Sequence, residues 1–375
     1  MIRRYAIDAR TATSHFPGIG RYVRSLLGEL AAQLSAHEQL VYFCSAQQKA
    51  RLGLPEDPRI SWHRAQSSPF GLRQQWEIPR LLRQARAHVY HSPYYLMPYW
   101  PGVPTVLTVY DIIPLHFPQH VSPRARLLFN LTTRLALRRA TNVIAISNAT
   151  RDDFISHFGV VEQRITATPL AAANHFRPAP VDLIAGIRRR LSLKGPYALY
   201  VGSNKPHKNL ARLLEAWQIV VGRMTEPRYL VLAGRLAAHD DDLSQRVDGL
   251  GLRDSVRFVR DVSDEDLVPL YTGAEVFVFP SLYEGFGLPV LEAMACGCAV
   301  ACGNRSSMPE IAGQAARYFD PDNSSEIASA VLELFLDASK RETFHQRALR
   351  RASAFSWART AAETLRIYRR VAPDA

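Results

Sequence analysis

The sequence predicts an α/β protein of two domains, each built around a parallel sheet. Its 375 residues exceed one ordinary hydrophobic core and suggest two domains of about 150 to 200 residues. Short β-type runs alternate with helical stretches, a pattern that favours parallel strands joined by helices. Between Thr168 and Pro180 the composition turns to loop residues and proline. We therefore expect an interdomain linker there.

The first half contains six runs that read as strands. They cover residues 5–7, 41–43, 60–62, 89–91, 105–110 and 143–146, with helical stretches between most of them. After the first run comes a loop with Gly18 and Gly20, and from Ile19 apolar residues recur at helical spacing. Both glycines are therefore expected at a strand-to-helix turn. A dinucleotide fingerprint would need a third glycine where Val23 stands, which disfavours an NAD-dependent oxidoreductase.

The second half restarts the same pattern. Strands are expected at residues 197–201, 229–233, 256–259 and 277–279, and the segment from Phe355 reads as a final amphipathic helix. The first of these strands runs into a loop that contains Ser203, Lys205 and Lys208. A proline and lysine turn of this kind is common at protein surfaces, and it is equally compatible with phosphate binding.

The stretch from Phe277 to Gly297 reads as strand, loop and helix. Pro289 is expected to open the helix and Gly297 to close it. Glu284 then lies in the loop and Glu292 in the first helical turn. The glycines of the loop let a ligand approach the backbone N–H groups at the positive end of the helix, which describes an anion site. A glutamate paired with the helix dipole after an ordinary turn is the alternative explanation.

The formal charge of +12 is concentrated in the first half of the chain. Residues 1–178 hold 21 Lys and Arg against 10 Asp and Glu, a surplus of 11, and the rest of the chain holds 25 against 24. Arginines recur beside apolar positions along predicted helices, at residues 73, 80, 83, 86, 124, 126, 134, 138 and 139. We expect this half to face an anionic surface or substrate, including peripheral contact with anionic membrane.

The remaining sequence features bear on cellular location, on the state of the cysteines and on nucleic-acid binding. The charged amino terminus does not resemble a secretory signal peptide, and no apolar run reaches the length of a membrane span, so a cytoplasmic location is expected, at the inner face of the membrane if the peripheral contact forms. The four cysteines, Cys44, Cys296, Cys298 and Cys302, lack the partners of a zinc site and are expected to be reduced, buried apolar residues. A pI of 9.8 admits nucleic-acid binding, but no nucleic-acid-reading motif is present, so no nucleic-acid partner is expected.

The 277–297 stretch closely resembles the signature of the family 4 retaining glycosyltransferases, which have the GT-B fold. The shared features are a small residue, then Glu-Gly-Phe-Gly-Leu-Pro from Glu284, then a second glutamate eight residues after the first, Glu292. The resemblance implies two doubly wound Rossmann-like domains facing each other across a cleft. Residues 1–175 would bind the acceptor, residues 176–355 would bind the nucleotide sugar, and a helix over residues 356–375 would pack back on the first domain.

The resemblance also implies roles for individual residues. Glu284 would hold hydroxyls of the donor sugar, Glu292 the ribose hydroxyls, and Lys208 the donor diphosphate. The remaining implied contacts are Asp111 as a catalytic residue, Gly202, Ser203, Gly285, Phe286, Gly287 and Leu288 on the donor, and Gly18 and Gly20 on phosphate and acceptor.

Two positions depart from the family pattern. Tyr110 stands where the family carries a histidine that reaches the donor sugar, although a tyrosine hydroxyl can also donate a hydrogen bond. Ser203 stands where many members carry an arginine, and Lys205 is the nearest cation that could replace it. These departures leave open a GT-B protein that binds sugar nucleotide without catalysis.

The expected reaction is transfer of a hexose with retention to a saccharide or lipid-linked saccharide, as in bacterial surface-polysaccharide and lipopolysaccharide biosynthesis. The chain most resembles mannosyltransferases, so GDP-mannose is the first choice of donor, with UDP- and dTDP-sugars as alternatives. No Asp-x-Asp motif is present in the strand and loop that lead to the first glutamate, from Phe277 to Glu284. We therefore expect no metal and no cofactor besides the nucleotide-sugar co-substrate.

Overall fold

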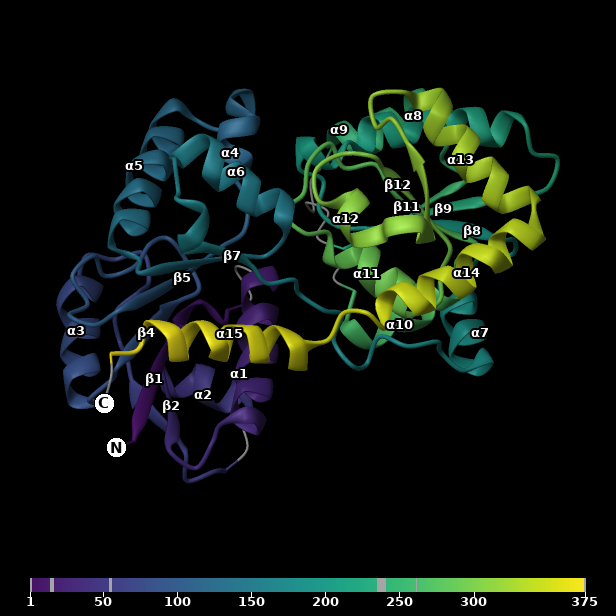
Figure 1. Cartoon of the computed structure of the whole chain (residues 1–375). Coiled ribbons are helices and arrows are strands. Elements are labelled where there is room, and N and C mark those ends of the chain that lie inside the picture. Colours follow the sequence, from purple (N-terminus) through teal and green to yellow (C-terminus); the bar gives the residue numbers. More distant parts are fainter. Residues whose placement is uncertain (1, 14–16, 54–55, 235–240, 261, 374–375) are drawn as a thin grey trace. The chain divides into compact units, whose positions relative to one another are not determined.

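The computed structural model describes residues 2–13, 17–53, 56–234, 241–260 and 262–373. Contacts within the chain divide it into two units (Figure 1). Unit 1 comprises Met1–Leu170 and Ser356–Ala375, and unit 2 comprises Ala171–Phe355. From the sequence, these domain boundaries were predicted to follow residues 175 and 355.

Unit 1 is a seven-stranded parallel sheet in the order β3-β2-β1-β4-β5-β6-β7. The strands are β1 (Arg3–Asp8), β2 (Glu38–Cys44), β3 (Ile60–Arg64), β4 (Val89–Ser92), β5 (Thr105–Val109), β6 (Asn142–Ala145) and β7 (Ile165–Ala167). The main helices are α1 (Pro17–Gln33), α2 (Ala46–Leu52), α3 (Gln74–Gln84), α4 (Ile113–His116), α5 (Pro123–Arg139), α6 (Asn148–Phe158) and α15 (Trp357–Val371). Short 3-10 turns are η1 (Ala9–Thr11), η2 (Pro118–His120) and η3 (Glu162–Arg164). The six expected strands are present, and β7 was not predicted.

The connections set which face of the sheet each helix covers. Because crossovers between parallel strands are right-handed, α1 and α2 cover one face while α3, α5 and α6 cover the other. Figure 1 shows α15, in yellow, beside α1. The face that carries α3 and α5 is covered without help from the C-terminal helix.

Helix α15 is fixed to the sheet of unit 1 through buried polar groups. The Tyr368 hydroxyl lies 2.5 Å from Nδ1 of His91, a fully buried residue of β4. Nε2 of that histidine lies 2.7 Å from Oγ1 of Thr108. Desolvation lowers the pKa of His91 to about 3, so the ring is neutral. At the end of the helix, Arg369 forms a two-pronged ion pair with Glu38, with N–O distances of 2.7 and 2.8 Å.

Unit 2 is a six-stranded parallel sheet in the order β10-β9-β8-β11-β12-β13. The strands are β8 (Tyr197–Val201), β9 (Tyr229–Gly234), β10 (Val256–Arg260), β11 (Val276–Phe279), β12 (Val300–Gly303) and β13 (Ala316–Phe319). The helices are α7 (Val181–Arg190), η4 (Pro206–Lys208), α8 (Leu210–Gly222), α9 (Asp241–Gly249), α10 (Asp264–Thr272), α11 (Leu288–Ala295), α12 (Met308–Ala312), η5 (Gly313–Ala315), α13 (Ser324–Leu336) and α14 (Ala338–Ala352). The two parallel sheets confirm the predicted fold class.

The strand order of unit 2 determines where a ligand can bind. The chain reverses direction along the sheet between β8 and β11, which are hydrogen-bonded neighbours. In open parallel sheets this switch point leaves a crevice at the carboxyl ends of the two strands, since the connections depart to opposite faces. A ligand-binding site is therefore expected at the loops that follow β8 and β11.

Two further predictions concern the cysteines and membrane-spanning helices. All four cysteines are buried and free, which confirms their predicted apolar role. Within the described part of the chain, no helix combines the length and the apolar character needed to cross a bilayer.

Candidate active site

The two loops at the switch point bring together Lys208 and Glu284. Lys208 ends η4, just after β8, and Glu284 lies in the loop after β11. Nζ of Lys208 lies 2.5 Å from Oε1 of Glu284, and the two side chains are only 15% and 11% exposed. The same ammonium group lies 5.3 Å from the ring centre of Phe279, at the end of β11. A cation and a carboxylate, 76 residues apart, thus share one partly desolvated position.

Backbone and side-chain bonds from Asn209 and His207 hold the lysine loop against the glutamate loop. Asn209 adopts a left-handed conformation, with φ of 62°, which asparagine tolerates better than most residues. Its side-chain amide donates to the carbonyls of Pro280, at 3.2 Å, and Pro321, at 2.6 Å. The carbonyl of His207 accepts a bond from the N–H of Leu282 at 2.9 Å. The position of Lys208 is therefore set by its two chain neighbours.

Two serines hold the backbone of the glutamate loop. The hydroxyl of Ser306 donates to the carbonyl of Glu284 at 2.5 Å. The hydroxyl of Ser307, which is completely buried, lies 2.9 Å from the same carbonyl and 2.8 Å from that of Phe286. The sequence interpretation did not single out either serine. The turn before α12 carries both, but only the folded chain shows that they support this loop.

Gly287 is required by the backbone where the loop enters α11. Its φ is 95°, a conformation that side chains other than glycine rarely adopt. A Cβ atom here would also lie 2.2 Å from Cε of Met308. The N–H groups of Phe286, Gly287 and Leu288 accordingly belong to the amino end of α11, where the helix dipole favours negative charge.

Glu292 lies deeper than the sequence suggested. It is the fifth residue of α11, not part of its first turn as predicted, because the helix already begins at Leu288. Only 2% of Glu292 is exposed, and Oε2 accepts a hydrogen bond from the hydroxyl of Tyr271 at 3.2 Å. Burial, with a smaller contribution from the Glu292 charge, raises the pKa of the Cys296 thiol to about 12. The surroundings of Glu292 are thus largely protein.

Gly202 and Ser203 sit where β8 meets the lysine loop. A Cβ atom at Gly202 would lie 2.5 Å from the hydroxyl of Tyr200. That hydroxyl donates to the carbonyl of Ser203 at 2.7 Å and thereby fixes the turn. Burial, with the Glu284 charge, holds the pKa of Tyr200 well above its ordinary value, so it remains a donor. Lys205 is exposed.

The predicted site residues of unit 1 lie after β5 and at the start of α1. The hydroxyl of Tyr110 is buried and has no hydrogen-bond partner within the described residues, and its ring packs edge-on against Tyr22 at 5.8 Å. Burial, together with the charges of nearby tyrosines, holds its pKa well above the ordinary value. Asp111 is half-buried, and Oδ1 accepts the N–H of Ile113 at 3.1 Å.

Gly18 and Gly20 do not occupy a turn, contrary to the prediction. Helix α1 begins at Pro17, so both lie in its first helical turn. At Gly18 a side chain would meet open space. A Cβ atom at Gly20 would lie 3.0 Å from the carbonyl oxygen of Thr13. The close approach of the preceding strand-end loop therefore explains Gly20 alone.

The structure thus gathers Glu284, Lys208, the 285–288 backbone, Gly202 and Ser203 around one switch point in unit 2. The arrangement supplies a cation, a carboxylate and a positive helix end within one set of loops. Among the described residues no group of three or more His, Cys, Asp or Glu is placed to hold a metal ion. Chemically, such a site can bind an anionic phosphate beside a group that stabilises positive charge.

Comparison with known proteins supports both units. Residues 17–171 match the family "Glycosyltransferase Family 4", and residues 187–351 match "Glycosyl transferases group 1". The chain is 35% identical over 302 residues to O-antigen chain mannosyltransferase B of Escherichia coli, covering 79% of this chain and 77% of that protein. It is 29% identical over 265 residues to the serotype-specific mannosyltransferase WbdA of Escherichia coli, covering 68% of this chain but 32% of WbdA.

Solved structures share the fold at low sequence identity. Anabaena HepE, in complex with UDP and glucose, superposes with a TM-score of 0.77 at 18% identity, over 98% of this chain and 99% of HepE. Sucrose-phosphate synthase from Thermosynechococcus elongatus gives a TM-score of 0.75 at 22% identity, over 98% of both chains. Together with the two family matches and the O-antigen mannosyltransferase relative, these findings show that the chain is a glycosyltransferase enzyme of family 4, with the GT-B fold.

Proposed function

We propose that this glycosyltransferase transfers mannose from GDP-mannose, with retention of anomeric configuration, to a saccharide or lipid-linked saccharide acceptor in surface-polysaccharide synthesis. Mannosyltransferases recur among its relatives, including O-antigen chain mannosyltransferase RfbU of Salmonella typhimurium, at 27% identity over 63% of this chain. In the reaction, the bond between the anomeric carbon and the diphosphate oxygen breaks, and an acceptor hydroxyl oxygen bonds to that carbon. The hydroxyl proton leaves with the nucleoside diphosphate.

The observation that carries the proposal is the pairing of Lys208 with Glu284 at the switch point. As the sugar–phosphate bond breaks, negative charge grows on the diphosphate and positive charge on the sugar ring. Lys208 and the amino end of α11 stabilise the first, and the carboxylate of Glu284 stabilises the second. These groups are fixed by Asn209 and Ser307 and need no reorganisation during the reaction.

The remaining assignments belong to the same proposal. Glu292 holds the ribose hydroxyls, and Gly202 and Ser203 line the diphosphate from the β8 side. Asp111, with Gly18 and Gly20, serves acceptor and sugar from unit 1, without a contact from the buried hydroxyl of Tyr110. No metal or further cofactor takes part. The basic unit 1 also makes peripheral contact with anionic lipid at the inner face of a membrane.

A thermal-shift panel with GDP, UDP, dTDP and ADP tests the donor assignment. A ligand at 100 times its dissociation constant stabilises the folded state by about 2.7 kcal/mol, so the cognate nucleotide should raise the melting temperature most. Stabilisation by UDP alone would show that the donor is a UDP-sugar and not GDP-mannose. NMR of the product's anomeric proton, compared with that of the donor, tests retention.

A GT-B protein that binds sugar nucleotide without catalysis is the competing function. The departure at Tyr110, with its inward hydroxyl, is the observation that favours it. Acceptor-dependent release of GDP from GDP-mannose separates the two functions. Binding of GDP without any such release would establish the competing one.

A further inference from the structure

Unit 1 carries an exposed apolar surface on the face covered by α3 and α5. We call the α3–α5 surface the set Leu72, Trp76, Trp100, Leu127, Leu128 and Leu131. These six are half of the twelve large apolar side chains that are exposed among the described residues. Trp76 is 70% and Trp100 67% exposed. Since tryptophan is usually buried, two exposed tryptophans on one face call for a partner.

Contacts between the elements make this a single surface. The amide of Gln75, in α3, donates to the carbonyl of Met97 at 3.0 Å and accepts from the N–H of Tyr99 at 3.0 Å. The guanidinium of Arg139, at the end of α5, lies 5.0 Å from the ring centre of Trp100. The loop between β4 and β5 therefore bridges the two helices.

Helix α5 carries apolar side chains on both its buried and its exposed face. The buried residues are Phe129, Thr132, Thr133, Ala136 and Leu137, and the hydroxyl of Thr133 has no hydrogen-bond partner within the described residues. Its outer face carries Leu127, Leu128 and Leu131, which are 68%, 58% and 54% exposed. A helix of a globular protein normally turns its apolar stripe to the core. The outward leucines of α5 indicate that a second apolar phase covers them.

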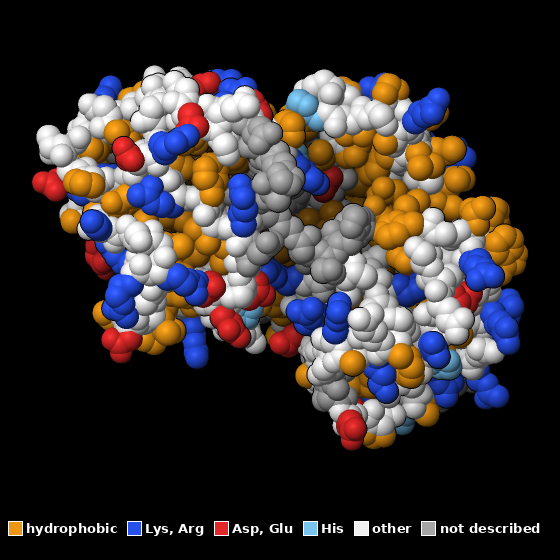
Figure 2. All heavy atoms as spheres, turned by 180° about the vertical axis from the view of Figure 1, so that it is seen from behind, with side chains coloured by type: hydrophobic (Ala, Val, Ile, Leu, Met, Phe, Trp, Pro, Cys, Tyr) orange, Lys and Arg blue, Asp and Glu red, His pale blue; other side chains and the backbone are white. Residues whose placement is uncertain are grey.

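The charges of α5 indicate that the partner covering these leucines also carries negative charge. The helix contains five arginines and no acidic residue. Arg124, Leu131 and Arg138 follow one another at seven-residue spacing, so two arginines flank the leucines on the same side of the helix. Toward the right-hand edge of Figure 2, where unit 1 lies in this view from behind, hydrophobic side chains (orange) and Lys and Arg side chains (blue) lie beside one another. Leucine, tryptophan and arginine on one helical surface are the composition of an interfacial membrane helix.

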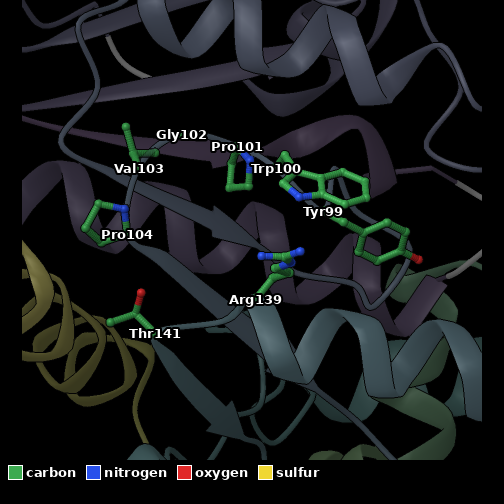
Figure 3. Close-up of a pocket in the computed structure, with 8 residues that line it drawn as sticks. All are labelled: Tyr99, Trp100, Pro101, Gly102, Val103, Pro104, Arg139 and Thr141. Carbon is green, nitrogen blue, oxygen red and sulfur yellow. The ribbon is translucent and has the colours of Figure 1, made fainter.

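A hollow continues the surface at the end of α5. It has a volume of about 480 Å³ and is lined by Tyr99–Pro104, Arg139 and Thr141 (Figure 3). Figure 3 shows the side chain of Arg139 reaching from α5 toward the rings of Trp100 and Tyr99. The hollow lies at the amino ends of β5 and β6, whereas substrate-binding loops occupy carboxyl ends in such sheets. It therefore belongs to the apolar surface and not to a substrate site.

We infer that the α3–α5 surface docks unit 1 on an anionic lipid bilayer, with the leucines and tryptophans in the interface and the arginines on lipid phosphates. This inference rests on the membrane contact proposed above and names the residues that make it. A second copy of the chain is the less suitable occupant. A two-fold contact would place this surface against itself and oppose arginines to arginines.

Vesicle co-sedimentation of the full chain, without donor or acceptor, tests the inference. The wild type should bind phosphatidylcholine vesicles containing phosphatidylglycerol, bind pure phosphatidylcholine far more weakly, and lose binding as salt rises. The variant Leu127→Ser/Leu128→Ser/Leu131→Ser should bind the anionic vesicles more than tenfold more weakly. Arg124→Gln/Arg138→Gln should lose about fivefold for each arginine.

The matched control is Val181→Ser/Leu183→Ser on α7 of unit 2. These side chains are 78% and 56% exposed, and α7 ends in three arginines. The control should bind as the wild type does. All variants should keep the wild-type circular dichroism and transfer to a water-soluble acceptor, which separates docking from catalysis.

Several outcomes would overturn the inference. The membrane contact would lie elsewhere if the leucine variant bound vesicles as tightly as the wild type does. The same would follow if the control lost as much vesicle binding as the leucine variant. A wild type that ignores anionic vesicles while still transferring sugar would remove the membrane contact and leave the proposed reaction standing. A wild-type dimer in light scattering that the leucine variant dissociates would assign the surface to a second copy.

Discussion

Nζ of Lys208 and Oε1 of Glu284 lie 2.5 Å apart, across the two loops that flank the switch point of unit 2. Each residue has a separate role in the proposed reaction, one on the diphosphate and the other on the sugar. Because they share a partly desolvated position, each sets the electrostatic environment of the other. A diphosphate that engages Lys208 must therefore compete with the carboxylate of Glu284.

This competition makes opposite predictions for the two partners. Glu284→Gln should lower kcat by roughly 10² or more, since the positive charge that develops on the sugar loses its fixed counter-charge. The same variant should bind free GDP at least as tightly as the wild type, because Lys208 no longer has an anionic partner. Lys208→Met should lower kcat and also weaken GDP binding. Steady-state kinetics and calorimetric titration of both variants test this.

The matched control is Glu275→Gln, which neutralises another ion pair of unit 2. Glu275 lies 2.7 Å from Arg341 and is partly buried, but it is not part of the switch-point loops. It should alter neither kcat nor GDP affinity. Full kcat in Glu284→Gln would show that the carboxylate only holds the lysine loop.

Tyr110 gives a prediction about the departure from the family pattern. Its buried hydroxyl has no partner among the described residues, and such a group destabilises the fold by about 1 to 3 kcal/mol. Tyr110→Phe should therefore melt at the same or a higher temperature, with kcat within about twofold of the wild type. In the control Tyr22→Phe, the lost hydroxyl lies 2.9 Å from Oγ1 of Thr108. That variant should lose about 1 kcal/mol. A large fall of kcat in Tyr110→Phe would place the hydroxyl on a substrate.

The predictable part of the fold is the part encoded locally. Buried strands such as β8 and β11 appear as short apolar runs, because parallel strands are covered on both faces. The strand, loop and helix around Glu284 were likewise predicted from Gly and Pro positions. β7 was missed because a three-residue strand carries little local signal.

The unpredicted part depends on partners distant in sequence. Ser307 supports the Glu284 loop from 23 residues away, and nothing near either residue marks that contact. The inward hydroxyl of Tyr110 follows from packing against Tyr22, 88 positions earlier. The sequence placed arginines beside apolar positions on α5. It did not reveal that Leu127 and Leu131 are exposed while Phe129 and Thr133 are buried.

Transfer should survive removal of divalent metal ions. In the proposed reaction, the cation on the diphosphate is the ammonium group of Lys208, assisted by the amino end of α11. Incubation with EDTA should leave kcat unchanged in the wild type. Addition of Mg²⁺ to Lys208→Met should not restore activity. A loss in EDTA that Mg²⁺ reverses would contradict this prediction.

The attachment of α15 to unit 1 should weaken in acid. Hydrogen bonds from Arg369 lower the pKa of Glu38 from 4.5 to about 2 in the folded state. Because the unfolded chain takes up the proton at a higher pH, the stabilisation is complete above about pH 4.5 and is lost as pH falls toward 2. It amounts to about 3 kcal/mol. Hydrogen exchange of α15 amides in Glu38→Gln should exceed that of the wild type near pH 6.

The comparison of exchange rates must hold pH constant between proteins. The excess in Glu38→Gln should shrink steadily below pH 4.5 and vanish near pH 2. Glu363→Gln is the matched control, since its partner Arg366 is 71% exposed and surface pairs contribute little. It should exchange as the wild type does at every pH. A constant difference between Glu38→Gln and wild type down to pH 2 would exclude the ion pair as the cause.

Glu292 allows binding and structural roles to be separated. A contact to ribose hydroxyls is made equally in the ground and transition states, so Glu292→Gln should raise the donor KM and leave kcat nearly unchanged. Loss of one such contact weakens nucleotide binding by about tenfold. Tyr271→Phe removes the 3.2 Å hydrogen bond to Oε2 but keeps the carboxylate. It should lower the melting temperature without ligand, by the equivalent of about 1 kcal/mol, and leave KM unchanged. If Glu292→Gln instead matches Tyr271→Phe, with earlier melting and unchanged KM, Glu292 stabilises the interior of unit 2 and does not bind the donor.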